Sequence, residues 1–290
     1  MKFFARLSSL IEAQGLAGPV FSVYSRIAHP EAKCAAQCRA ALSGKRGVEI
    51  GGLSSMFGSK GTLPVYASFA NLDNWNPYAT HSTLRECPGE NVKIDGLELG
   101  KIPDNSVPFI LSCHSLEHIA NPLKALKEWK RILVPDGYLL LVLPHGDATF
   151  DHRRKKTTFE HIVQDYNVNM GEDDLTHMPE FAEYDFTGPG WSADFMPPGY
   201  GLKGEDELRE RFKDNPRWRY MHQHVFDSPL ACKCVDFAGF QIREAEAARP
   251  FHIIILAQKI SGKVDNSLYL GNNYPGFLNS PFKSDRANRS

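Results

Sequence analysis

Histidines are concentrated in the middle of this 290-residue chain, where eight of the eleven lie between His114 and His224. Histidine is the side chain whose charge changes closest to neutral pH, so this region suits proton transfer or metal binding. His145 directly follows the apolar run YLLLVLP, and Asp151 and His152 come within seven residues of it. We predict that His145 removes a proton from a hydroxyl group of the substrate, with His152 and Asp151 as the alternative catalytic groups.

A second set of residues combines glycines with polar side chains, each just after or near the end of a short apolar run. The set comprises Glu49, Gly51, Gly52, Asp73, Asp95, Gly96 and His114. Glycines let the backbone approach a ligand closely, and carboxylates accept hydrogen bonds from ribose hydroxyls and from an exocyclic amine. Singly, each acidic residue could also cap a turn. Together, at successive strand ends, they favour an adenosine site.

Two pairs of residues have a spacing that suits metal ligands, although each has another interpretation. His161 and Asp165 lie four apart on a predicted helix, so they are neighbours on its surface. They would form a base with its orienting carboxylate, two ligands of a divalent metal, or a surface pair. His222 and His224 point to one face of an extended segment. Their ligand set would be completed by Asp151, Glu172 or Asp173. These pairs leave a divalent metal ion as a possible cofactor, but we assign no residue to it as a ligand.

From Arg46 to Pro144, short apolar runs alternate with amphipathic stretches, which predicts βαβ units and a parallel sheet. The run YLLLVL has no polar alternation, so it should be a strand covered on both faces. The later runs FQIREA and HIIILAQ are joined by a short turn around Pro250, which requires an antiparallel pair. We expect an α/β fold with a doubly wound, Rossmann-like sheet. It should be mostly parallel, end in an antiparallel hairpin and carry helices on both faces.

The chain divides into three predicted parts. Residues 1–45 are interpreted as an N-terminal helical extension, residues 46–258 as the main domain, and residues 259–290 as a polar C-terminal tail over the surface. Inside the domain, residues 146–224 interrupt the alternation with a charged run, a short helix and the segment GPGWSADFMPPGYG. A stretch of that length in a compact domain is more often functional than idle. We interpret it as a lid or substrate-binding insertion.

Four stretches carry a family resemblance: GVEIGG at 47–52, LDN at 72–74, residues 92–144 and residues 228–258. The third is the most specific, because its Asp-Gly, Pro-Asp-Asn-Ser, Leu-Glu-His and Pro-Asp-Gly landmarks occur in the family's order and spacing. Together the stretches resemble the class I S-adenosylmethionine-dependent methyltransferases, in particular the group that acts on small molecules. The resemblance implies that residues 46–258 are a methyltransferase domain with S-adenosylmethionine as its cofactor.

The resemblance also implies roles for the residues at the strand ends. By it, Glu49, Gly51 and Gly52 surround the methionine moiety, Asp73 holds the ribose, Asp95 and Gly96 hold adenine, and His114 lies beside the cofactor. The family usually has a further glycine at the position of Leu53, so this chain departs from it there. A nicotinamide cofactor is disfavoured, because a Gly-Gly pair lacks the Gly-x-Gly-x-x-Gly pattern. The alternative function is a catalytically degenerate, methyltransferase-like binding or scaffold domain.

The composition excludes several classes of partner. With 33 basic and 34 acidic residues the formal net charge is −1, so no global field attracts nucleic acid. No window of eighteen apolar residues occurs, which predicts no membrane insertion. The six cysteines lack zinc-ribbon spacing and are expected to be reduced thiols in the cytoplasm.

The histidines, charged residues and aromatics of the insertion suit a small polar acceptor, such as a sugar or glycan precursor. We expect methylation of its hydroxyl or amine. The oligomeric state follows from none of these patterns.

Overall fold

The architecture is that of a computed structural model. It describes residues 30–75, 89–92, 94–97, 99–177, 179–180, 215, 219, 221–271 and 273–287, together with residues 11, 16, 20, 23 and 24. Most of the predicted N-terminal extension before Pro30, and the segment 188–201 of the insertion, lie outside the described residues. None of the described helices is long and apolar enough to cross a membrane.

Seven strands of the described chain form one sheet in the order β3-β2-β1-β4-β5-β7-β6. They are β1 (Arg46–Ile50), β2 (Asn71–Trp75), β3 (Asn91–Val92), β4 (Val107–Cys113), β5 (Leu133–Pro144), β6 (Gln241–Ala248) and β7 (His252–Gln258). The first five are parallel, whereas β7 runs antiparallel between β5 and β6. The predicted Rossmann-like sheet with its terminal hairpin is confirmed. Strand order reverses between β1 and β4, so ligands are expected beyond the carboxyl ends of these strands.

The central strands supply side chains to two separate cores, one on each face of the sheet. Every residue of β7 is buried, as are residues 139–144 of β5. Successive side chains of a strand point to opposite faces, so Leu139 and Leu141 join one core while Leu140 and Val142 join the other. This explains why YLLLVL shows no polar alternation.

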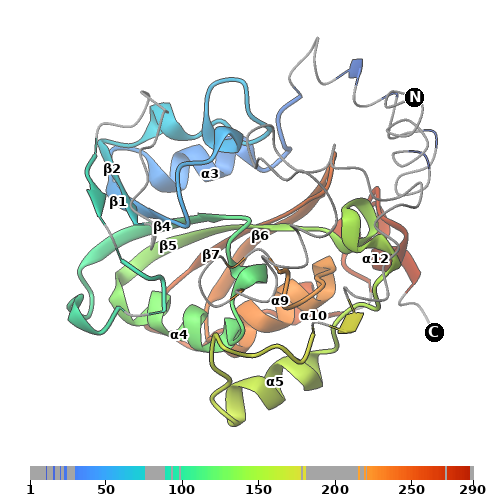
Figure 1. The fold of residues 1–290 in the computed structure, drawn as a ribbon. Helices are drawn as coiled ribbons and strands as arrows, with labels where there is room; N and C mark the ends of the chain where they lie inside the picture. The colour runs from blue at the N-terminus through green and yellow to red at the C-terminus, as the bar shows by residue number, and fades with distance from the viewer. Residues whose placement is uncertain are drawn as a thin grey trace, which may run out of the picture.

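Helices cover both faces of the sheet, as predicted (Figure 1). One face carries α3 (Ala35–Leu42) with the 3-10 turns η1 (Ser55–Phe57) and η2 (Tyr66–Ser68). The other carries α4 (Pro122–Ile132), α5 (Phe159–Asn167), α9 (Ser228–Phe237) and α10 (Ser267–Leu270). Helix α5 belongs to the predicted insertion, yet its Ile162 is fully buried in the core. The first part of the insertion is therefore packed on the domain.

Helix α4 shows how the sequence sets these elements. The Asn121 side chain accepts a hydrogen bond from the Lys124 amide, and Pro122 occupies the first helical position, where its missing N–H costs nothing. Leu123 and Trp129 are fully buried on the face toward the sheet. The helix places η4 (Leu116–His118), which precedes it, at the carboxyl end of β4.

The connection between β1 and β2 departs from the βαβ pattern. Residues 51–70 form only the two short turns η1 and η2, without an α-helix. Their Gly and Ser content offers no apolar helical period, and Phe57 and Leu63 anchor the connection by full burial instead. Helix α3, which precedes β1, covers this face in place of a crossover helix.

The C-terminal segment, predicted as a polar tail over the surface, forms helices instead. After Gln258 the chain forms α10, α11 (Pro275–Leu278) and α12 (Lys283–Ala287). Phe277 and Phe282 are buried, and Asp285 is only 4% exposed. The segment is anchored because apolar side chains recur within its polar sequence. It packs back onto the domain near the carboxyl end of β5.

Candidate active site

The glycines after β1 have backbone conformations that other residues rarely adopt. The φ angle is 103° at Gly51 and 115° at Gly52, both positive. Gly51 also lies against Ser115, which follows β4, so that a Cβ on Gly51 would stand 1.8 Å from the Ser115 Oγ. The ends of β1 and β4 thus meet through bare backbone. Glycine is required at position 51 because Ser115 fills the space that a side chain would take.

Glu49, within β1, is fully buried and holds the loop that follows the strand. Its Oε1 accepts a hydrogen bond from the Ser54 amide at 2.9 Å, and its Oε2 accepts one from the Tyr66 hydroxyl at 2.8 Å. Burial raises the pKa of Glu49 to about 8, although these two hydrogen bonds act in the opposite direction. Glu49 therefore holds the glycine loop through both of its carboxylate oxygens.

Asp73 does not follow the second strand, which corrects the prediction of its position. It lies at the centre of β2, in register with Val48 of β1. Its Oδ1 accepts hydrogen bonds from the Glu90 amide at 3.0 Å and from the Asn71 side chain at 3.2 Å. Asp73 therefore ties β2 to the segment leading into β3. Residues 76–88, which follow β2, lie outside the described part of the chain.

Asp95 and Gly96 lie beyond β3 in a turn that approaches β1, as predicted. A Cβ on Gly96 would be 2.7 Å from the Cγ2 of Ile50, so the backbone of the turn contacts the end of β1. The Asp95 carboxylate accepts a hydrogen bond from the Leu97 amide at 3.0 Å and pairs with both terminal nitrogens of Arg219, at 3.1 and 2.5 Å. Arg219, near the end of the insertion, thus forms an ion pair with the carboxylate that was predicted to hold adenine.

A cavity of about 490 Å³ lies where β4 ends and β7 begins. It is lined by His114, which follows β4 with a φ of 50°, and by His252, the first residue of β7. The His114 Nε2 is 3.1 Å from the His252 Nδ1. Burial, reinforced by His252, holds the pKa of His114 well below its usual value, and burial lowers that of His252 to about 4. Both rings are therefore neutral at pH 7, with one donating to the other.

The rest of this cavity, termed the β4–β7 cavity below, is lined in part by the connection after β1. Ser54, Ser55, Lys60 and Thr62 bring hydroxyls and one ammonium group to it. These groups can donate and accept hydrogen bonds. Apolar groups line the cavity as well, among them Met56 and Phe251.

His145 is not among the residues that line the β4–β7 cavity, which corrects its prediction as the catalytic base. It is fully buried, with its Nε2 3.0 Å from the Asp285 Oδ1, and its Nδ1 accepts a hydrogen bond from the Asp147 amide at 3.1 Å. Its ring stacks on Phe282, with the two centroids 4.1 Å apart. Both ring nitrogens are engaged by the protein. His145 therefore fixes α12 against the end of β5.

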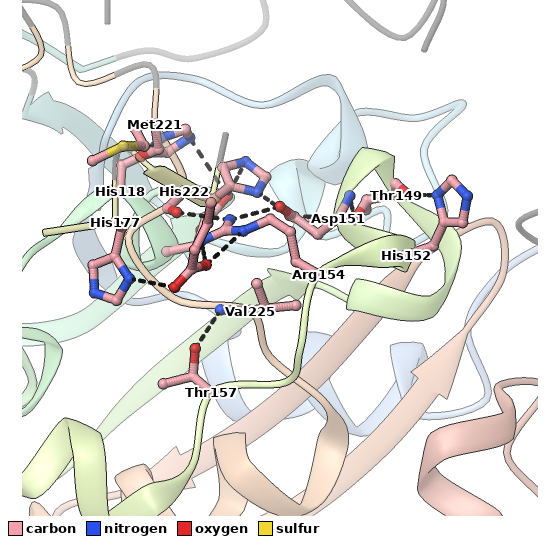
Figure 2. Close-up of polar contacts among 12 residues, drawn as sticks. His118, Thr149, Asp151, His152, Arg154, Thr157, His177, Met221, His222 and Val225 are labelled. Atoms are coloured by element: carbon pink, nitrogen blue, oxygen red, sulfur yellow. Dashed lines mark hydrogen bonds and ion pairs between the residues drawn. The ribbon is translucent and has the colours of Figure 1, made fainter. Parts of the chain in front are cut away.

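Asp151 and His152, the other predicted catalytic residues, lie in η6 (Phe150–Arg153). Asp151 is 2% exposed and contacts the Arg154 Nη1 at 2.8 Å and the His222 Nδ1 at 2.5 Å (Figure 2). Burial alone would raise the pKa of Asp151, but the charges and hydrogen bonds of His222 and Arg154 lower it to about 2. The His152 Nδ1 instead lies 2.9 Å from the Thr149 carbonyl oxygen. Asp151 thus orients His222, and the prediction that it meets an acceptor is corrected.

Three of the histidines in and around α5 form one group, termed the His177 group, which comprises His161, His177 and His224. The His161 Nε2 lies 3.2 Å from the His177 Nε2 and 3.4 Å from the Asp165 Oδ2, to which the His224 Nε2 also comes within 3.0 Å. The predicted neighbours His161 and Asp165 are therefore joined by two histidines from other segments.

A second group, termed the Glu117 group, comprises Glu117, His118 and His222. His222 and His224 thus belong to different groups, although the sequence places them on one face. Of their predicted partners, only Asp151 contacts His222. Glu172 instead accepts a hydrogen bond from the Ala120 amide and lies 3.5 Å from Arg219. The structure does not bring His222 and His224 together as ligands of one ion.

Four residues of these arrangements were not singled out from the sequence: Glu117, His118, His177 and His252. Glu117 and His118 belong to the Leu-Glu-His landmark, which was assigned to the family pattern without a chemical role. His252 opens an apolar strand, where no local feature marks it. His177 stands in a polar stretch rich in acidic residues, where no spacing marks it as a ligand.

Residues 62–141 match the family described as "Methyltransferase domain". The matched stretch runs from the connection after β1 through β4 and α4 into β5. No protein with curated annotation matches the chain significantly.

Several solved structures are similar to this chain at low identity. A SAM-dependent methyltransferase from Thermotoga maritima is 15% identical, with 86% of this chain and 98% of that one covered and a TM-score of 0.42. One from Aquifex aeolicus is 13% identical, with 78% and 87% covered and a TM-score of 0.39. The 1,6-didemethyltoxoflavin-N1-methyltransferase of Burkholderia thailandensis, solved with S-adenosylhomocysteine, is 11% identical, with 79% of each chain covered and a TM-score of 0.41.

The family match falls on the part of the sheet where strand order reverses, directly beside the glycine loop. Strand order, the antiparallel β7 and the bare backbone after β1 agree with what the Leu-Glu-His and Pro-Asp-Gly landmarks imply. The match thus places a methyltransferase domain at residues 62–141, in agreement with the resemblance that the sequence carries.

Proposed function

We propose that this protein transfers the methyl group of S-adenosylmethionine to a hydroxyl, or alternatively an amine, of a small polar acceptor such as a sugar or glycan precursor. The β4–β7 cavity is the observation that supports this most. Its volume of about 490 Å³ lies in the range of small-molecule sites. Its hydroxyls, lysine and histidine pair suit a ligand with several hydroxyl groups.

The residues at the end of β1 fit the cofactor. Gly51 and Gly52 have positive φ angles, and a side chain at Gly51 would collide with Ser115. The turn of Asp95 and Gly96 beside Ile50 would hold the adenine end. When bound there, S-adenosylmethionine would supply an electrophilic methyl group on its sulfonium. Asp73 is the weakest of these assignments, since it lies inside β2.

The contribution of the protein to the rate would be mainly positional. Methyl transfer is an in-line displacement, and holding the two reactants in line contributes about 7 to 11 kcal/mol at best. Ser54 and Thr62 come from the connection after β1, whereas His114 follows β4. An acceptor held between them would lie next to the strand ends that carry the cofactor residues.

We assign to His114 the role first predicted for His145. His114 lines the cavity and is neutral at pH 7, so a ring nitrogen can accept the proton of an acceptor hydroxyl. His252, 3.1 Å away, would fix the tautomer of His114. The depressed pKa makes His114 a weak base, which suits an acceptor whose proton leaves only as the methyl group arrives.

The test combines cofactor binding with a search for the acceptor. S-adenosylhomocysteine binding is measured by calorimetry, and transfer of a radiolabelled methyl group is measured against sugars, sugar nucleotides and other polyols. We expect His114→Gln to reduce transfer by about 10²- to 10⁴-fold while cofactor affinity is kept. His161→Gln, in a histidine of the His177 group, is the matched control and should retain transfer.

Two results would contradict the proposal. Full transfer by His114→Gln would remove its catalytic role, and transfer to none of the polyols but to an apolar acceptor would refute the substrate class. Failure of the wild-type protein to bind S-adenosylhomocysteine would favour the alternative, a catalytically degenerate binding or scaffold domain. The ion pair between Asp95 and Arg219 is the feature compatible with that alternative.

We further propose that the protein acts in the cytoplasm on a soluble acceptor, without nucleic acid. The five cysteines that the structure describes are free, which agrees with a reducing compartment. The division into a methyltransferase domain over 46–258, with a lid in 146–224, stays a prediction. A divalent metal also stays a prediction at this point, and the two histidine groups are its candidate sites.

A further inference from the structure

Glu117 is a carboxylate in a setting that calls for a cation. It lies in η4 at the end of β4, is fully buried, and has no hydrogen-bond partner for either side-chain oxygen among the described residues. A carboxylate removed from water and left without donors is strongly unfavourable unless a proton or a cation lies beside it.

Two histidines face this carboxylate. The Glu117 Oε1 lies 3.7 Å from the His118 Nε2 and 4.0 Å from the His222 Nε2. The two rings meet edge to face, with their centroids 4.7 Å apart. His118 comes from η4 and His222 from the segment before α9, so the three groups converge from two separate parts of the chain.

The opposite ring nitrogens of both histidines are held by acceptors. The His118 Nδ1 lies 3.1 Å from the Met221 carbonyl oxygen, and the His222 Nδ1 lies 2.5 Å from the Asp151 Oδ2 (Figure 2). With Nδ1 held by an acceptor in each ring, the nitrogen that lies toward Glu117 is Nε2. Histidines that bind metals almost always have their second nitrogen supported in this way.

We propose that Glu117, His118 and His222 bind a divalent transition-metal ion of the Zn²⁺ type. Three side chains that can each offer a ligand atom converge, an arrangement that a cation at the centre would stabilise. Their donor atoms lie within 4.8 Å of one another. Bonds of about 2.0 to 2.2 Å to one ion require only small side-chain movements from this position. Two imidazoles and one carboxylate are a common donor set for such ions.

Asp151 and Arg154 support His222 on the side away from Glu117. Arg154 donates to Asp151 at 2.8 Å and to the His222 carbonyl oxygen at 2.9 Å, so it holds both the carboxylate and the backbone of the histidine that the carboxylate orients. A metal site would therefore explain why the buried Asp151 and Arg154 hold His222 in place. The side chain of His118 is 25% exposed, which leaves an approach for the ion.

The His177 group is the matched comparison, because it also has three histidine or acidic donors within the same distance. There the His161 Nε2 can donate its proton to both the His177 Nε2 and the Asp165 Oδ2, at 3.2 and 3.4 Å. Protons alone can therefore link that group, and its Asp165 carboxylate also has the His224 ring as a partner. Of the two groups, the Glu117 group is the one whose buried carboxylate lacks a hydrogen-bond partner among the described residues.

The function of the ion rests on the proposed methyl transfer. Three protein ligands leave a coordination position open in a four-coordinate site. Glu117 and His118 follow the same strand as His114, which lines the β4–β7 cavity. An ion there would lower the pKa of an acceptor hydroxyl bound at the open position, and His114 would take the proton that this hydroxyl loses.

The test measures metal binding separately from activity. The full chain is stripped with EDTA, titrated with Zn²⁺ by calorimetry and analysed for bound metal by mass spectrometry. Binding of Co²⁺ is followed through its visible absorption, which reports nitrogen and oxygen ligands. We expect one equivalent in the wild type, at least a 100-fold loss of affinity in Glu117→Gln and His222→Gln, and little change in His177→Gln. Circular dichroism confirms folding, and Glu117→Gln is the variant expected to fold best.

Three results would overturn the proposal. The wild type could bind no Zn²⁺ or Co²⁺, Glu117→Gln could bind them unchanged, or the loss could occur in His177→Gln while Glu117→Gln binds normally. These outcomes are independent of the proposed function, because no acceptor is present. Full methyl transfer by the stripped protein would refute the role of the ion in acceptor binding while the site itself stands.

Discussion

Replacing Asp285 should reveal how strongly the C-terminal segment holds the domain together. The carboxylate is 4% exposed and accepts hydrogen bonds from the Ser228 amide at 3.0 Å, the Ser228 hydroxyl at 2.8 Å and the Ser280 hydroxyl at 2.6 Å. It also lies 3.0 Å from the Nε2 of the fully buried His145. Asp285→Ala removes all four interactions at once.

The magnitude follows from the groups left behind. An unsatisfied buried donor costs about 1 to 3 kcal/mol. The two hydroxyls can turn to other acceptors, but His145 and the Ser228 amide are fixed by their surroundings. With these two donors left unpaired, we expect Asp285→Ala to lower the free energy of unfolding by about 2 to 6 kcal/mol. Asp285→Asn, which keeps the volume and one acceptor oxygen, should lose less.

The effect should depend on pH in a defined direction. Burial alone would raise the pKa of Asp285, but the hydrogen bonds from His145, Ser280 and Ser228 hold it below its usual value. A depressed carboxylate pKa stabilises the fold above the unfolded value of about 3.9, and this contribution is lost as the pH falls through the lower folded value. The difference between wild type and Asp285→Ala should therefore be full at pH 7 and shrink below about pH 4.

Urea unfolding at a series of pH values, followed by circular dichroism, measures both quantities. Asp265→Ala, which removes an exposed carboxylate of the same segment, is the control and should have a much smaller effect. A loss below about 1 kcal/mol in Asp285→Ala, or a loss that does not change with pH, would refute the assignment of His145 and Asp285 as a structural lock.

Three further predictions concern the cofactor end of the sheet. Because burial raises the pKa of Glu49 to about 8, wild-type stability should fall as the pH rises from about 4.3 toward that value. Glu49→Gln should lack this decrease in stability. If urea unfolding at pH 5 and pH 8 shows the same decrease in both proteins, the burial argument is contradicted. Gly51→Ala would place a Cβ 1.8 Å from the Ser115 Oγ at a φ of 103°. We expect at least a tenfold loss of S-adenosylhomocysteine affinity by calorimetry, and unchanged affinity would exclude Gly51 from the site. Asp95→Ala should weaken S-adenosylhomocysteine binding by about 1 to 3 kcal/mol, whereas Arg219→Ala should not. An equal loss in both would mean that the ion pair, rather than a contact to adenine, matters.

The sequence was most informative about elements whose determinants are local. Asn121 and Pro122 start α4, and the unbroken apolar run of β5 predicts a strand with two covered faces; both features are present in the structure. The structure of the connection after β1 was harder to predict, because this connection is held by the burial of Phe57 and Leu63 rather than by any periodic pattern.

The candidate site was harder to predict because its partners are distant in sequence. His145 stands directly after a strand, as a catalytic residue of this fold would, yet its role is set by Asp285, which lies 140 residues away. Glu117 was visible only as part of a landmark, since the sequence does not reveal that its carboxylate is buried without a donor. Spacing identifies residue types, whereas burial and long-range pairing decide what those residues do.

The long separation between His145 and Asp285 also bears on how the chain is made. At roughly 5 to 20 residues per second, a ribosome needs about 7 to 28 s to add the 140 residues between them. Strand β7, which pairs with β5 in the finished sheet, is likewise synthesised only after the whole insertion. During that interval β5 is an open edge with the apolar sequence YLLLVL. Unpaired apolar edges promote aggregation. We expect nascent chains halted within the insertion to depend on chaperones that bind extended apolar segments.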